Sequence, residues 1–278
     1  MRGRRYAAVA VRAPSARIVI RSERLPVHLY GGWVSRTPFL RGLVLLWDTL
    51  GLGMKALMFS ADVAQEGDGG EQARFDRPLQ WGTVALSMTI GIGVFFLLPL
   101  GAAGLVEWAI PSSLLANVVE GVLRLGLLVG YIWAIGHVPE IRRVFAYHGA
   151  EHMTIHAFEA GDPLDVEHIQ RYPPAHPRCG TAFLLLVVAV SIVLFALLGS
   201  PDWPIRILSR ILGIPLIAGI AYEVLRFGGA RASHPLVKLI VAPGLALQKL
   251  TTRYPEPDMI EVAVAAFEEM HRLELASA

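Results

Sequence analysis

The sequence predicts a mainly α-helical, polytopic membrane protein, and two observations support this prediction. Hydrophobic residues make up 54% of the 278 residues and charged residues only 17%, whereas about a quarter of the residues of a soluble domain are charged. The chain also contains several apolar stretches of about 20 residues, the length that crosses a bilayer as a helix. Large soluble domains are therefore excluded, and a net charge of +2 gives no excess suited to nucleic acid.

The N-terminal region, 1–37, is predicted to form a short cytoplasmic β-hairpin. Two segments in which apolar and polar residues alternate, RYAAVAVR and ARIVIR, flank a turn at Ala13–Ser15. Seven arginines fall within residues 1–24 and interrupt every apolar run, so we expect no cleavable signal peptide.

The next segment, 38–61, is long enough to span a bilayer but carries charges at Arg41, Asp48 and Lys55. Charges inside a spanning helix are costly unless they are paired or face a polar interior. We therefore expect an amphipathic helix that lies at the interface or is re-entrant, with a full span as the alternative. A polar loop is expected over 62–80.

Four stronger apolar segments are predicted to span the membrane as two helix pairs, within 81–136 and 181–227. They are Thr83–Val106, Leu114–Ile135, Thr181–Gly199 and Ile205–Phe227. The short connection inside each pair contains no lysine or arginine, whereas the segment between the pairs, 137–180, contains four arginines. The positive-inside rule then puts this segment and both termini on the cytoplasmic side of the inner cell membrane.

The C-terminal region, 228–278, is predicted to contain an interfacial segment and a cytoplasmic helix. Residues 235–250 are short and interrupted by proline and glycine, which favours a half-inserted helix over a fifth span. In the last segment, Ile260, Val264 and Phe267 recur at helical spacing. This spacing predicts a surface helix that packs on another part of the chain.

Four charged residues fall inside the predicted spans. Glu120 and Arg124 are four positions apart on one helix, so pairing between them explains both. Arg206 and Arg210 lie in the outer half of the last span and are expected to snorkel to the membrane surface.

The residues that carry chemistry gather in 137–180, on a helix that Pro139 and Gly161 are expected to bracket. His148 and His152 are four residues apart, so both imidazoles project from one helix face, at a separation suited to binding one Zn²⁺. With Glu151 they complete H-x-x-E-H, the inverted zincin pattern. In that pattern the glutamate is the catalytic base that acts on water activated by the metal. The alternative is a set of polar residues on an exposed helix face.

A zinc enzyme needs a third protein ligand beside an open position for water. Glu223, at the cytoplasmic end of the last span, is the first choice, because two histidines and a carboxylate form a known catalytic set. A salt bridge from Glu223 to Arg226 is the alternative. Cys179, the only cysteine, would favour a closed structural site or would simply be a small buried hydrophobe. Further candidates for ligands or supporting residues are His156, His176 and Glu159.

Several motifs resemble the YqhQ-like family of bacterial membrane proteins. FAYHGAEHMTIHAFE and HPRCGT are the most specific, and FLRGLVLLWDTLGLGMKAL, AYEVLRF and PGLALQKLTTRYP occur in the family's order. The resemblance extends from Met1 to about Phe267 and implies a metal-dependent enzyme whose reaction is not assigned. Related chains usually have a Gly-rich lead-in with a glutamate before the Met-Arg-Gly that opens this chain. The comparison therefore leaves open a start upstream of Met1.

Two functions follow from these patterns. The leading hypothesis is a metal-dependent hydrolase with a zinc or other divalent ion at the cytoplasmic face. The alternative is a non-catalytic membrane scaffold or assembly factor with a structural metal site or none. Metal transport is disfavoured, because the spans lack a ladder of histidines and carboxylates. The expected partner is the lipid bilayer, with a homo-oligomer or a membrane-protein partner left open and no nucleic acid expected.

Overall fold

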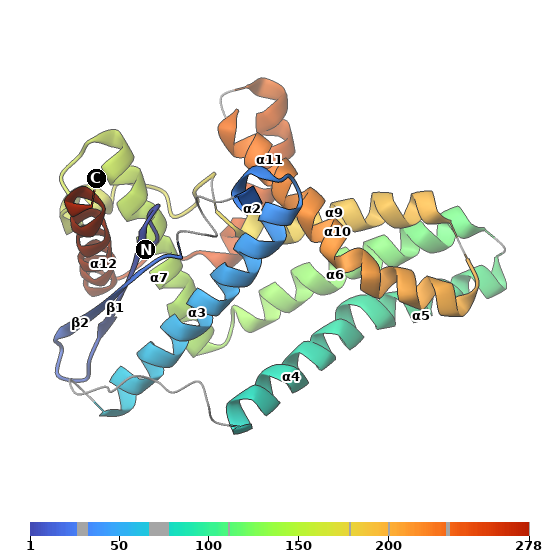
Figure 1. Cartoon of the computed structure of the whole chain (residues 1–278), viewed down its shortest axis with the longest axis horizontal. Helices are drawn as coiled ribbons and strands as arrows, with labels where there is room; N and C mark the ends of the chain where they lie inside the picture. The colour runs from blue at the N-terminus through green and yellow to red at the C-terminus, as the bar shows by residue number, and fades with distance from the viewer. Residues whose placement is uncertain are drawn as a thin grey trace. The chain divides into compact units, whose positions relative to one another are not determined.

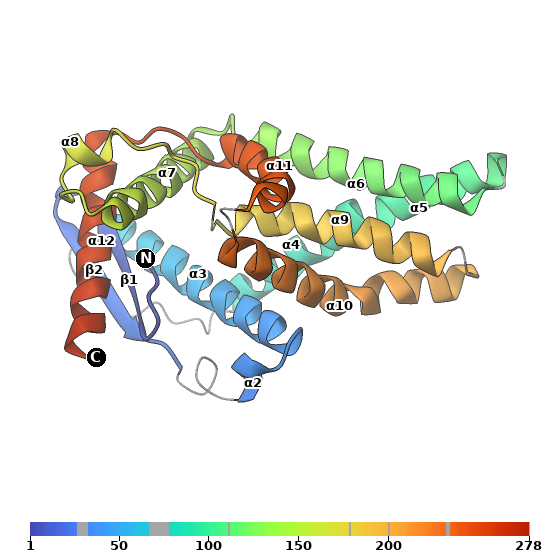
Figure 2. The same ribbon diagram turned by 90° about the horizontal axis from the view of Figure 1, so that it is seen from above.

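The computed structural model describes residues 1–26, 33–66, 78–110, 112–177, 179–199, 201–231 and 234–277. The chain divides into two compact units, whose helices and strands are labelled in Figures 1 and 2. The first unit comprises 1–73, 136–177 and 248–278, and the second comprises 74–135 and 178–247. The first unit therefore brings together three segments that lie far apart in the sequence.

The predicted hairpin is confirmed. Strands β1 (Tyr6–Arg12) and β2 (Ile18–Arg24) pair antiparallel over their whole length, with Val9 opposite Arg21 near the middle. The hairpin is covered on both faces, because Ala8 packs with Phe267 and the next residue, Val9, packs with Phe59. Small and β-branched side chains suit such a sheet.

The C-terminal helix α12 (Pro257–Ala276) covers this hairpin and also packs against helix α7 (Pro139–Ala160), as Figure 2 shows. Ala150 of α7 and Ile260 of α12 are fully buried in the core between the two helices. Helix α7 ends at Gly161, whose φ of 79° is a left-handed conformation that glycine adopts at low cost. The expected helix bounds and the expected packing of the C-terminal helix are both confirmed.

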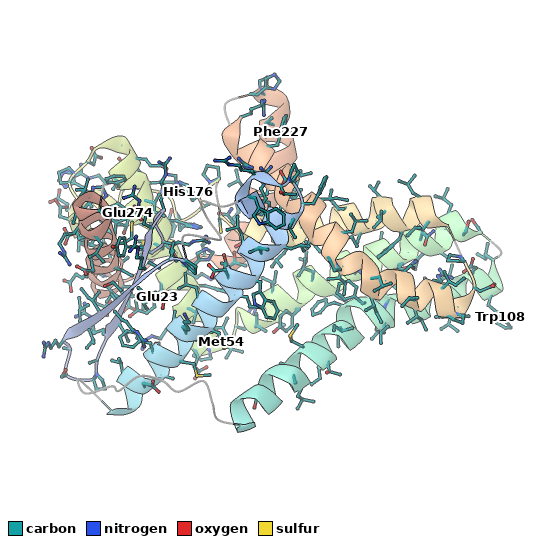
Figure 3. All side chains as sticks on the ribbon, viewed as in Figure 1. Glu23, Met54, Trp108, His176, Phe227 and Glu274 are labelled. Atoms are coloured by element: carbon teal, nitrogen blue, oxygen red, sulfur yellow. The ribbon has the colours of Figure 1, made fainter. Side chains whose placement is uncertain are left out.

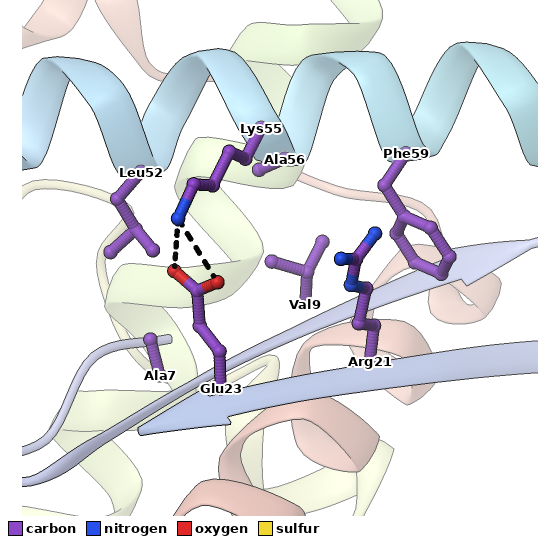
Figure 4. Close-up of a pocket in the computed structure, with 8 residues that line it drawn as sticks. All are labelled: Ala7, Val9, Arg21, Glu23, Leu52, Lys55, Ala56 and Phe59. Carbon is purple, nitrogen blue, oxygen red and sulfur yellow. Dashed lines mark hydrogen bonds and ion pairs between the residues drawn. The ribbon is translucent and has the colours of Figure 1, made fainter. Parts of the chain in front are cut away.

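After the short helix α2 (Trp33–Arg36), helix α3 (Leu40–Glu66) packs on the same hairpin. Figure 4 shows this contact, in which Lys55 Nζ lies 3.3 Å from a carboxylate oxygen of Glu23. By length and composition, Leu40–Ala64 could cross a membrane. The full span that the sequence left as an alternative is therefore retained beside the interfacial one. Of the expected loop over 62–80, residues 67–77 lie outside the described part of the chain.

The second unit holds the two predicted helix pairs. Its helices are α4 (Pro78–Ile92), the π-helical η2 (Gly93–Leu97), α5 (Leu98–Ala109), α6 (Ser113–Ile135), α9 (Thr181–Leu198) and α10 (Trp203–Ala230). Four segments here are long and apolar enough to span a membrane: Ala85–Ala109, Ser113–Ile135, Thr181–Leu198 and Trp203–Gly228. Helix α11 (Pro235–Thr251) has 17 residues and is interrupted by Pro243. The mainly α, polytopic fold class with its N-terminal hairpin is confirmed.

Two groups of charged residues pair within the second unit, Glu107 with Arg206 and Glu120 with Arg124 and Arg210. Both arginines expected to snorkel are buried, Arg210 at 0% exposure and Arg206 at 3%, so that expectation is wrong. Arg210 Nη2 donates to Glu120 Oε2 at 2.8 Å, and Arg206 pairs with the carboxylate of Glu107. Arg210 finds its partner on the neighbouring helix α6, so its guanidinium group need not reach the surface. In Arg206 only Nη1 is paired, and Nε and Nη2 are buried without a hydrogen bond among the described residues. The expected pair of Glu120 and Arg124 is confirmed at 2.7 Å.

Candidate metal centre

Helix α7 carries a stripe of imidazole and carboxylate side chains at His148, His152, His156 and Glu159. These residues are spaced by four, four and three positions, so they share one face of the helix. That face is covered, because only 5% of His152 is exposed. The covering segments belong to the same unit and comprise 172–177 and 248–253. A solvated helix face is therefore excluded for His152.

Gly149 allows the chain to approach α7 closely. A Cβ atom at this position would lie 2.0 Å from the carbonyl oxygen of Arg253, closer than real Cβ contacts come. The amide of Arg253 donates to the carbonyl of Phe145 at 3.0 Å and holds that segment in place. The residue after the first histidine of HGAEH is therefore required to be glycine by packing.

His148 and His152 are held by the same kind of hydrogen bond. Nδ1 of His148 lies 2.9 Å from the carbonyl oxygen of Thr251, and Nδ1 of His152 lies 2.7 Å from that of Pro174. A carbonyl oxygen only accepts, so each Nδ1 carries the hydrogen and donates it. In the neutral rings Nε2 then carries the lone pair, and the ring centroids are 4.4 Å apart. Histidine ligands of metals are commonly fixed by such a bond to a backbone carbonyl.

His156 is held in the opposite way. Its Nε2 lies 2.9 Å from the carbonyl oxygen of Ala175, so Nε2 donates and Nδ1 carries the lone pair of the neutral ring. The ring stacks on Tyr172 with an interplanar angle of 7°. His156 therefore differs in tautomer from the two preceding histidines of the stripe.

His176 is positioned through its backbone by Gln248, which is fully buried. The amide of His176 donates to Gln248 Oε1 at 2.9 Å, and Gln248 Nε2 donates to the carbonyl of His176 at 3.0 Å. Burial lowers the pKa of the His176 imidazole, the charge of His156 adds to this, and Glu159 at 3.5 Å opposes it. The ring is therefore neutral at pH 7, the form in which imidazole binds metals.

His148 and His152 are candidate metal ligands in the first unit, and Cys179, which belongs to the second unit, is a candidate third ligand by its chemistry. Cys179 follows His176 by three residues, so the chain keeps the two backbones within about 10 Å of each other. Its side chain is buried and is not in a disulfide, and Sγ lies 3.2 Å from Thr181 Oγ1.

The remaining predicted residues stay candidates. Glu151 is half-buried on α7, directly before His152. Glu223 is half-buried in α10 and, like Cys179, belongs to the second unit. The catalytic role of Glu151 remains a prediction, and Glu223 remains the alternative to Cys179 as the third ligand.

Sequence reasoning missed the groups that orient the histidines. They are the carbonyl oxygens of Pro174, Ala175 and Thr251 and the side-chain amide of Gln248. A carbonyl group is present at every residue, so residue type gives no signal for it. The one signal in the sequence was Gln248, an amide in the largely apolar segment 235–250, because an amide that becomes buried needs hydrogen-bond partners.

Comparison with known proteins agrees with the resemblance seen in the motifs. Residues 37–273 match the model of a family described as "Protein of unknown function (DUF1385)". A relative from Bacillus subtilis (strain 168), "Uncharacterized protein YqhQ", is 33% identical over 254 residues, which cover 88% of this chain and 80% of the relative. No solved structure matches the chain. Because the family model spans α3 to α12 almost completely, the chain belongs to the DUF1385 family of YqhQ-like proteins.

Proposed function

We propose that the protein is a membrane-bound, metal-dependent hydrolase that holds a zinc-type divalent ion at His148, His152 and Cys179. The observation that carries this proposal is the shared tautomer of the two histidines, whose Nδ1 atoms both donate to backbone carbonyls. Such bonds orient two Nε2 lone pairs in the manner of metal ligands. Three protein ligands leave a fourth position for water, as in catalytic zinc sites, whereas structural sites are closed by four.

The chemistry that such an ion would supply is a lowered pKa of bound water, from 15.7 to about 7. Glu151 is the proposed base and would take a proton from the attacking water. The water oxygen would form a bond to the acyl carbon or phosphorus of the substrate as the bond from that atom to the leaving group breaks. Glu151 would then return the proton to the leaving group. The reaction is hydrolysis of an ester, amide or phosphoester.

We place the centre at the cytoplasmic face of the inner membrane. The N-terminal hairpin, α7 and α12 pack in one unit, so we assign these three elements to the same side of the membrane. The excess of arginine in these segments supports the cytoplasmic side for both chain termini.

Metal content tests this proposal directly. We expect one zinc per chain in the purified wild-type protein and none in His148→Ala or His152→Ala. His168→Ala is the matched control, because His168 is a partly exposed histidine paired with Asp165 on the short helix α8 (Val166–Ile169). The measurement is elemental mass spectrometry of the protein in detergent. Zinc retained at full stoichiometry in both α7 variants would remove the centre.

The third ligand and the base need separate variants. Cys179→Ser should weaken zinc binding at least about 10-fold, as losing a direct ligand should exceed the smaller effects of supporting residues. Glu223→Gln should leave zinc binding unchanged, and Glu151→Gln should keep zinc and lose hydrolysis. The reverse result for Cys179 and Glu223 would establish the two-histidine, one-carboxylate set. Loss of zinc from Glu151→Gln would make that residue a ligand.

A further inference from the structure

The first unit contains a groove of about 1120 Å³ between α3 and α7, with β1 along it. Most of the residues that line it are apolar or small, among them Met54 of α3, which Figure 3 labels. The lining on α3 extends from Leu46 to Ala64, and 18 helical steps correspond to about 27 Å. One acyl chain spans about 15 Å, half of a bilayer's hydrocarbon core. The groove is therefore long enough for one such chain.

The apolar surface of α3 continues from the groove to the outside of the unit. Leu50 and Leu57, which line the groove, are 58% and 62% exposed, and Trp47 of the same helix is 79% exposed. This helix is also apolar and long enough to enter a membrane. An exposed apolar surface of this extent, on a helix of this kind, is suited to contact with lipid rather than with water. An acyl chain could therefore enter the groove from the bilayer without crossing water.

The polar residues of the groove suit a phosphate group. Arg143 on α7 is exposed, and a guanidinium group matches phosphate oxygens in charge and geometry. Arg12 on β1 already pairs with Glu261 at 2.7 Å, but its buried Nε makes no hydrogen bond. The acidic group that faces the groove is Glu140, one turn before Arg143. A site with apolar walls and an arginine on one wall fits an amphiphile with a phosphate.

We propose that this groove binds one acyl chain of a phospholipid, with the phosphate at Arg143. Glu140, Val144 and Tyr147 line the groove on one face of α7, and Glu151 follows Tyr147 by one turn on that face. The head of the lipid would thus lie on the groove side of α7, about 12 Å along the helix from the proposed base. The assignment of this lipid as the substrate rests on the proposed function, whereas its binding does not.

A photocrosslinking experiment tests the groove. The probe is phosphatidic acid with a diazirine in one acyl chain, at low abundance in phosphatidylcholine nanodiscs that hold the full-length protein. Mass spectrometry of the labelled peptides should place the label on 46–64 and on β1. Label confined to peptides outside the groove would overturn the proposal.

Two glycines of α3 provide a matched pair of variants. A Cβ atom at Gly51 or at Gly53 meets nothing within 4 Å, so both positions accept a side chain. Only Gly53 lines the groove. We expect Gly53→Leu to reduce labelling about 10-fold and Gly51→Leu to leave it unchanged, because leucine stabilises a helix equally at both positions. Equal labelling of the two variants would remove the groove as the binding site.

The phosphate contact has its own controls. Arg143→Gln should lower labelling by phosphatidic acid about 10-fold but not labelling by diacylglycerol with the same diazirine chain. The neighbouring Arg142, exposed on α7 and outside the groove lining, should tolerate Arg142→Gln. Equal labelling of the wild type by the two probes would overturn the phosphate contact. His152→Ala should lose zinc and keep labelling, so the two proposals can fail independently.

Discussion

Within the described part of the chain, each unit contains a polar cluster, and the hydrogen bonds of the two clusters differ in kind. In the second unit, the carboxylate of Glu120 accepts from Arg124 and Arg210, all three nearly fully buried. In the first unit, His148 and His152 each use one ring nitrogen on a backbone carbonyl. The first arrangement pairs opposite charges with each other. The second fixes the tautomers of neutral rings and leaves a defined lone pair on each.

The charged cluster has further partners. Arg124 also donates to Ser191 Oγ at 3.0 Å and to the carbonyl of Phe95 at 3.0 Å, and the guanidinium carbon of Arg210 lies 4.2 Å from the ring centroid of Phe195. These bonds link α6, α9, α10 and η2. A cluster that joins its own helices in this way stabilises the fold, whereas oriented histidine lone pairs are available to bind a ligand. The comparison thus separates a structural cluster from a candidate functional one.

Glu120→Gln is the variant expected to have the largest effect. It leaves two arginines buried side by side without a counter-charge, and breaking a buried ion pair costs about 3–5 kcal/mol. We expect that loss in the free energy of unfolding in detergent, with zinc per folded chain unchanged. Glu107→Gln is the milder control, because 27% of the Glu107 side chain is exposed. Loss of zinc from folded Glu120→Gln protein would show that the two clusters are coupled.

Gly149→Ala addresses the first unit with a smaller expected effect. The added methyl group would meet the carbonyl oxygen of Arg253, which cannot move without its chain, and overpacking of this kind costs about 1–3 kcal/mol. The shift would also disturb the nearby carbonyl of Thr251, so we expect zinc binding to weaken as well. Thermal unfolding and zinc titration measure the two effects.

Gly161→Ala is the control for Gly149→Ala. The φ of 79° at Gly161 strains an alanine by about 1 kcal/mol, but the added Cβ would meet no atom within 4 Å. It should destabilise the protein slightly and leave zinc bound. Equal zinc binding by Gly149→Ala and the wild type would contradict the idea that residues 248–253 orient His148.

The sequence predicts the local part of both clusters. Pro139 and Gly161 bracket α7 as expected, and the spacing of four between His148 and His152 puts them on one face. The i,i+4 pair of Glu120 with Arg124 follows from the same rule. In each case the information lies within a few turns of one helix.

The partners from distant segments could not be predicted. His148 bonds to a carbonyl 103 residues away, and Arg210 reaches Glu120 across 90 residues. Sequence position shows how far Arg210 lies from a helix end but not which carboxylate lies on the next helix. The expectation of snorkelling failed for that reason. A carbonyl acceptor has no residue type at all, so the tautomers of the histidines needed the structure.

The smallest expected effect belongs to a half-buried carboxylate, with which the fully buried Glu120 can be compared. Glu274 on α12, labelled in Figure 3, accepts hydrogen bonds at Oε1 from the amides of Arg5 and Tyr6, at 2.5 and 3.0 Å. Partial burial raises its pKa, but the amide donors outweigh this and the pKa is lowered. The contribution of this carboxylate to stability is therefore present at pH values above the pKa of the unfolded state, and it is lost as the pH falls through the pKa of the folded state.

Glu274→Gln should lower the free energy of unfolding by less than about 1 kcal/mol at pH 7, because solvent screens the site. It should also flatten the decline of stability below about pH 5. Glu268→Gln, at an exposed position of the same helix, should change neither quantity in unfolding measured from pH 7 to 3. An unchanged acid profile for Glu274→Gln would show that this carboxylate does not hold α12 on the hairpin.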